Sequence, residues 1–133
     1  MIRAALRVLL AAFYLIAGVL HLVFPRPFIT ITPRFVPAPE VVVWATGLAE
    51  ILGAIGLVQP FSRRLRQAAG WGLAAYALCV WPANVNHMLI DLARPEGGLG
   101  LAYHVPRLLA QPLLVALALW VGECWPPRRR SGA

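Results

Sequence analysis

Four long apolar segments, separated by short segments that carry arginine and proline, occupy most of this chain. They cover residues 4–24, 41–58, 67–90 and 106–124. Each approaches the ~20 apolar residues that an α-helix needs to cross ~30 Å of hydrocarbon. An open strand would leave backbone polar groups unpaired in lipid, so such segments take the form of helices. The pattern therefore predicts an all-α fold, an integral membrane four-helix bundle that forms a single transmembrane domain over residues 1–133.

The composition agrees with a protein that has almost no domain outside the bilayer. Hydrophobic residues make up 60% of the chain and charged residues only 13%, as in polytopic membrane proteins. The net charge of +7 would suit a nucleic-acid-binding protein, but the basic residues are all arginines and lie at the ends of the apolar segments. We therefore expect the lipid bilayer as the partner of this chain and no nucleic acid.

The arginines are distributed unequally between the two expected membrane faces. One face carries eight, namely Arg3, Arg7, Arg63, Arg64, Arg66 and Arg128–Arg130; the other carries four, namely Arg26, Arg34, Arg94 and Arg107. Arginine-rich short segments remain in the cytoplasm, so this asymmetry predicts that both termini are cytoplasmic. The first apolar run is too long for a cleaved signal peptide and is expected to be a retained anchor helix.

Two local patterns suggest how the spans are connected and packed. Residues 25–39 contain five of the twelve prolines, which disfavours a regular helix and predicts a loop on the membrane surface or over the mouth of the bundle. Small residues at helical spacing predict close helix contacts; they are Ala45, Ala49 and Gly53 in the second span and Ala68, Gly72, Ala75, Cys79 and Ala83 in the third.

Glu50 is the most informative polar residue, because it lies about ten residues into the second span and hence near the middle of the bilayer. An isolated carboxylate there would be strongly disfavoured, so it must be protonated or paired. It can serve as a structural hydrogen bond between helices, or as a group that exchanges protons or anchors a ligand. Arg107 is the natural partner in sequence terms, although an arginine at a span entrance can also extend into the lipid head groups.

Further polar residues of the spans share helix faces near the external end. Tyr14, Gly18 and His21 follow helical spacing in the first span, and His104, Arg107 and Gln111 do so in the fourth. In the third span, Pro82 is expected to kink the helix beside several polar residues. These positions predict an externally opening polar pocket that binds a ligand through His21, Glu50, Asn84, His87, Arg107 and Gln111. Within it, Arg107 would neutralise Glu50, Gln111 and Asn84 would donate hydrogen bonds, and His21 would relay protons.

Motifs for metal, nucleophilic or cofactor chemistry are not evident. The three histidines are not arranged as a zinc motif, so a metal site would have to be assembled from separate helices. Apart from Thr46, the serine and threonine residues lie outside the apolar segments. We therefore expect no catalytic residue, no metal and no intrinsic cofactor.

Several ordered motifs resemble the DoxX family of small membrane proteins. They are AGVLHLVFPRPF, PRFVPAP, TGLAEILGAIGLVQPFSRRL, VWPANVNHM and RLLAQPLL, and they extend over nearly the whole chain. Family positions are matched by His21, Glu50, Pro82, Asn84, Arg107 and Gln111, whereas Trp81 replaces the usual phenylalanine and Leu109 stands where proline is usual. The resemblance implies a multi-pass four-helix protein of the bacterial inner (plasma) membrane, associated with quinone- or thiol-linked redox systems.

The resemblance and the polar pocket together give the leading functional hypothesis. The chain would be an accessory subunit of a membrane redox system, binding a quinone or another apolar ligand, and not an enzyme on its own. Two alternatives remain: a structural or assembly module without a ligand, and a quinone-reactive oxidoreductase subunit that depends on a cofactor-bearing partner. A membrane redox partner protein and a homo-oligomer are both compatible with the sequence, while four spans without a repeat fit a transporter poorly.

Overall fold

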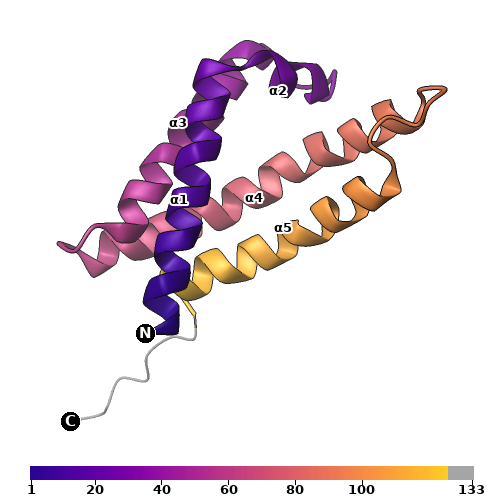
Figure 1. Cartoon of the computed structure of the whole chain (residues 1–133). Coiled ribbons are helices and arrows are strands. Elements are labelled where there is room, and N and C mark those ends of the chain that lie inside the picture. The colour runs from indigo at the N-terminus through magenta and orange to yellow at the C-terminus, as the bar shows by residue number, and fades with distance from the viewer. Residues whose placement is uncertain (126–133) are drawn as a thin grey trace, which may run out of the picture.

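The computed structural model describes residues 1–125, which form five helices and no strand (Figure 1). Four of the helices are long and apolar enough to cross a membrane. The long helices are α1 (Ile2–Val23), α3 (Pro39–Val58), α4 (Arg63–Leu92) and α5 (Leu101–Val121), and the short one is α2 (Arg26–Ile31). The prediction of an all-helical chain with four potential spans is confirmed. Of the arginines counted above, Arg128–Arg130 lie outside the described residues.

Two of the long helices begin earlier than hydropathy alone predicts. α4 begins at Arg63 because Ser62 caps it, its Oγ accepting a hydrogen bond from the backbone N–H of Leu65 at 3.3 Å. α5 begins at Leu101, so Pro106 lies inside the helix and not at its start. Boundaries that depend on capping and on tertiary contacts are poorly marked by hydropathy, since the first turn of a helix is often polar.

The proline-rich segment contains a helix that the sequence analysis did not expect. α2 forms because Pro25 and Pro27 occupy its cap and first turn, where a missing N–H breaks no helical hydrogen bond. The backbone carbonyl of Ile31 accepts a hydrogen bond of 2.8 Å from Asn86 Nδ2 in α4. Of the two positions expected for residues 25–39, packing over the mouth of the bundle is therefore the one observed.

The long helices are arranged as two pairs that form a V (Figure 1). α1 packs against α3, and α4 packs against α5; the pairs meet near the N-terminus and separate towards α2. We call these two parts of the molecule the converging end and the diverging end. The buried apolar core lies towards the converging end and consists of Leu10, Ala11, Tyr14, Ala54, Leu57, Leu73, Ala74, Ala118 and Val121. This arrangement leaves room between the pairs at the diverging end.

The small residues that allow close packing are largely not those that the spacing suggested. Ala45, Ala49, Ala68, Gly72 and Ala75 are exposed, so the predicted contact faces are wrong for most of their length, although Gly53 does meet a side chain of α4. A close approach of two backbones instead joins two other glycines, Gly18 of α1 and Gly47 of α3; a Cβ atom on the former would lie 2.6 Å from the carbonyl oxygen of the latter.

An ion cluster closes the converging end. Glu123, just after α5, lies 2.9 Å from Arg7 of α1, and 3.2 Å and 3.0 Å from Arg63 and Arg66 of α4. Burial alone would raise the pKa of Glu123, but the hydrogen bonds and charges of Arg66 and Arg7 outweigh it and hold this pKa below its ordinary value. The cluster therefore ties the two helix pairs together where they meet.

Candidate functional site

A cavity of about 550 Å³ lies between the two helix pairs at the diverging end, beneath α2. Its walls come from all five helices and are mostly apolar. They include Phe13, Phe28, Ile31, Phe35, Val36, Val42, Val43, Val80 and Leu114. Pockets of this size and character hold small apolar molecules, with a few polar groups fixing their orientation.

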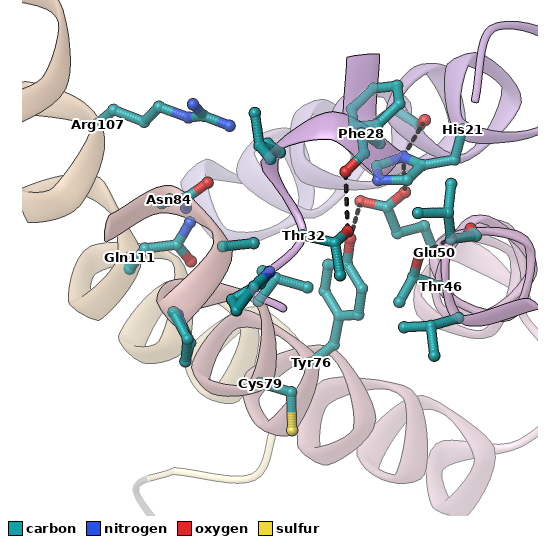
Figure 2. Close-up of a pocket in the computed structure, with 18 of the residues that line it drawn as sticks. His21, Phe28, Thr32, Thr46, Glu50, Tyr76, Cys79, Asn84, Arg107 and Gln111 are labelled. Atoms are coloured by element: carbon teal, nitrogen blue, oxygen red, sulfur yellow. Dashed lines mark hydrogen bonds and ion pairs between the residues drawn. The ribbon is translucent and has the colours of Figure 1, made fainter. Parts of the chain in front are cut away.

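Glu50 lies at the wall of this cavity and is only 3% exposed. The hydroxyl of Tyr76 in α4 donates a hydrogen bond of 2.7 Å to its Oε1 (Figure 2). His21 of α1 approaches its other oxygen, with Nδ1 2.9 Å from Oε2. The expected pair of Glu50 with Arg107 is wrong. The two residues belong to α3 and α5, on opposite arms of the V, and their side chains lie on opposite sides of the cavity (Figure 2).

His21 is held in one orientation by groups from three helices. Its Nδ1 is 2.8 Å from the carbonyl oxygen of Ala17, and its ring stacks on Phe28 of α2 at 3.7 Å between ring centres. A carbonyl oxygen can only accept, so Nδ1 carries a proton. The same nitrogen lies within ion-pair distance of Glu50 Oε2, so the imidazole links the backbone of α1 to the carboxyl group of α3.

Arg107 enters the cavity from α5 and is held by His87 of α4. Its Nη1 lies 2.6 Å from His87 Nδ1, and its guanidinium lies 5.7 Å from the ring centre of Tyr103. Of the two orientations that the sequence left open, the inward one is therefore observed. A guanidinium can only donate, so His87 Nδ1 is the acceptor and carries no proton.

Asn84 and Gln111 are buried at the junction of α4 and α5 and line the same cavity (Figure 2). Gln111 Oε1 has no hydrogen-bond partner among the described residues, and neither does the hydroxyl of Tyr14. Two buried oxygens that line the cavity are therefore left without a partner among the described residues. Leaving such a group unpaired costs about 1–3 kcal/mol, so these oxygens are positioned to bind water or the polar group of a ligand.

The structure thus brings most of the expected pocket residues together. His21, Glu50, Asn84, Arg107 and Gln111 line the cavity, whereas His87 stands behind it and contacts it through Arg107. The sequence analysis missed Tyr76, the main partner of Glu50. Its position deep inside a span, away from the interfaces that tyrosine favours, is the signal that could have identified it.

A second polar cluster lies beyond the cavity at the end of the α4–α5 pair. Asp91 is 1% exposed, and its Oδ2 accepts from the backbone N–H of Leu99 at 3.0 Å and lies 3.0 Å from His104 Nε2. His87 Nε2 is 3.6 Å from the same oxygen, and Arg94 Nη1 is 3.2 Å from Oδ1.

One nitrogen or oxygen atom each from His87, Asp91 and His104 lies within 4.8 Å of the others, a spacing that a metal ion could bridge. The hydrogen bonds favour another interpretation. Because Arg107 donates to His87 Nδ1, the neutral ring carries its proton on Nε2, the atom that would have to bind the ion. The carboxylate of Asp91 is also surrounded by donors. We therefore interpret the cluster as a hydrogen-bond network that joins α4 to α5.

Comparison with known proteins gives a family but no described activity. Residues 10–122 match the family described as "Domain of unknown function (DUF8561)", and the chain therefore belongs to this family. The matched region contains every residue that lines the cavity. No curated protein and no solved structure matches the chain.

Proposed function

We propose that this member of a family described only as of unknown function binds a lipid-soluble ligand in the cavity between its two helix pairs. The observation that carries the proposal is the combination of apolar walls with two buried oxygens that have no partner among the described residues, those of Tyr14 and Gln111. A purely structural cavity would be expected either to be filled by side chains or to have its polar atoms paired. A molecule with an apolar body and a small polar head group would pack against the apolar walls and form hydrogen bonds with the buried oxygens.

A quinone is the leading candidate for this ligand, and the protein is an accessory subunit of a membrane redox system. The support comes from the resemblance to the DoxX family, since all six of the resembling positions line the cavity; they are His21, Glu50, Pro82, Asn84, Arg107 and Gln111. A quinone ring fits the aromatic and aliphatic walls, and its carbonyl oxygens can accept from the hydroxyl of Tyr14 or the guanidinium of Arg107. The electrons come from a cofactor-bearing partner.

The orientation that we propose places both termini in the cytoplasm of a bacterium and the cavity in the outer half of its inner membrane. The support is the position of the arginines. Arg3, Arg7, Arg63, Arg64 and Arg66 belong to the converging end, where both pairs of helices meet. By the positive-inside rule this end is cytoplasmic, which leaves the diverging end and α2 on the external side.

Native mass spectrometry of protein extracted gently from its own membrane tests the proposal. We expect a bound quinone or other lipid-soluble molecule on the wild-type chain, and its loss in Glu50→Gln, which replaces the carboxyl group at the cavity wall by an amide. Glu40→Gln is the matched control, because Glu40 is exposed in the first turn of α3, and it should retain the ligand. A wild-type chain that carries no small molecule would refute ligand binding.

A structural or assembly module is the second candidate, favoured by one contact. The hydrogen bond from Tyr76 to Glu50 joins α4 to α3 across the two arms of the V and would hold them together without any ligand. In that case Glu50→Gln would lower the thermal stability of a chain that carries no ligand. A cofactor-bearing subunit that copurifies with the wild-type chain would instead support the redox assignment.

A further inference from the structure

Arg107 carries a positive charge that no carboxylate of the described residues neutralises. All five aspartate and glutamate side chains of the sequence lie within the described residues 1–125, and none of them forms an ion pair with Arg107. The residue lies six positions after the start of α5, about 9 Å along the helix at the usual rise. A charge at such a depth in a membrane protein is costly, and arginines there are usually paired or face a functional cavity.

His87 fixes the position of this charge without cancelling it. The imidazole accepts from Arg107 Nη1 through a ring nitrogen that carries no proton, and hence as a neutral group. The network around Asp91 holds His87 in turn, with His87 Nε2 3.6 Å from the carboxylate. The guanidinium has five N–H donors and this contact uses one of them, so the others remain to face the cavity that Arg107 lines.

The cavity is positively charged on the side where Arg107 lies, because the other charged groups that line it lie elsewhere. Glu50 lies on the opposite side, where Tyr76 donates to it and His21 lies beside it. We propose that the ligand of the cavity carries a single oxyanion on an apolar body, and that Arg107 binds this oxyanion. The inference rests on the proposed ligand-binding function and adds to it the charge of the head group.

Two kinds of lipid-soluble molecule have this chemistry, a fatty-acid carboxylate and the ionised hydroxyl of a hydroxyquinone. Guanidinium binds both, because its planar N–H groups match an oxygen anion, and a hydrogen bond between charged partners is about twice as strong as a neutral one. The experiment therefore compares each acid with a neutral analogue of nearly equal size. The pairs are oleate with methyl oleate, and a 2-hydroxy-3-alkyl-1,4-naphthoquinone with its 2-methoxy derivative.

Binding is measured with the full chain in phosphatidylcholine nanodiscs, where no anionic lipid competes. We expect at least one acid to bind the wild-type chain roughly ten- to a hundredfold more tightly than its neutral analogue, the range given by one charge-assisted hydrogen bond. Arg107→Gln should abolish this preference, and Arg107→Lys, which keeps the charge, should retain part of it. Arg64→Gln is the control, since Arg64 is exposed in the first turn of α4 at the converging end, far from the cavity.

The outcomes separate the inference from the function on which it rests. Equal binding of acid and neutral analogue by the wild-type chain, or an undiminished preference in a folded Arg107→Gln variant, would overturn the inference alone. No binding of any of the four molecules would refute the proposed function as well. Competition by added phosphatidylglycerol would assign Arg107 to the phosphate of a bilayer lipid and would also overturn the inference.

Discussion

Replacing Gly18 by alanine should weaken the contact between α1 and α3 and disturb the cavity at the same time. A Cβ atom at position 18 would lie 2.6 Å from the carbonyl oxygen of Gly47 and 2.8 Å from Cγ1 of Ile51. Ordinary van der Waals contact begins at 3.4 Å. The oxygen belongs to the backbone and cannot rotate away, so the two helices must move apart.

The expected size of the effect follows from two opposing terms. Adding one methyl group to a closely packed contact costs about 1–3 kcal/mol. Alanine is favoured over glycine within a helix by about 0.5–1 kcal/mol, which leaves a net destabilisation of roughly 0–2.5 kcal/mol. Because His21 lies three residues further along α1, the same movement takes its ring away from Glu50, now 2.9 Å distant, and should weaken ligand binding.

Unfolding of the purified chain in mixed detergent micelles measures the first effect, and native mass spectrometry measures the second. Gly72→Ala in α4 is the matched control, because a Cβ atom there would meet no other atom within 4 Å. This control should be as stable as the wild-type chain or slightly more stable. If Gly18→Ala unfolded like Gly72→Ala and retained its ligand, the close approach of α1 and α3 would not be what positions His21.

Three further substitutions test the hydrogen bonds and ion pairs. Tyr76→Phe removes the 2.7 Å hydrogen bond to Glu50 and should cost about 1–3 kcal/mol in the same unfolding assay; a change within error would contradict the role of Tyr76 in joining the helix pairs. Asp91→Asn should destabilise the α4–α5 pair by a similar amount, about 1–3 kcal/mol, because His104 loses its carboxylate partner; retained stability would argue against the network. Glu123 has a lowered pKa in the folded chain, so its stabilisation is present above the ordinary carboxyl pKa and is lost as the pH falls through the lowered value. Glu123→Gln should therefore lose this part of the pH dependence of unfolding, and an identical pH profile would refute the assignment.

The four apolar helices could be predicted from the sequence alone, since their existence depends on local hydropathy and on the requirement to pair every backbone group in lipid. It also identified which polar residues are unusual, because an ionisable group such as Glu50 or Arg107 is anomalous in an apolar segment wherever the segment packs. Helical spacing then indicated correctly that Tyr14, His21 and Gln111 face inwards, as their burial shows. Each of these properties depends on the sequence of one helix and not on how the helices pack together.

Which residues meet across helices depends on the packing of the whole chain and could not be predicted from the sequence. Glu50 is paired with Tyr76 and lies beside His21, not Arg107, because the helices form a V that separates α3 from α5 at the diverging end. The close contact of Gly18 with Gly47 likewise depends on how α1 and α3 rotate about their axes, which spacing along one helix does not specify. Small and polar residues occur on several faces of these helices, and packing selects among them through the combined fit of all five helices.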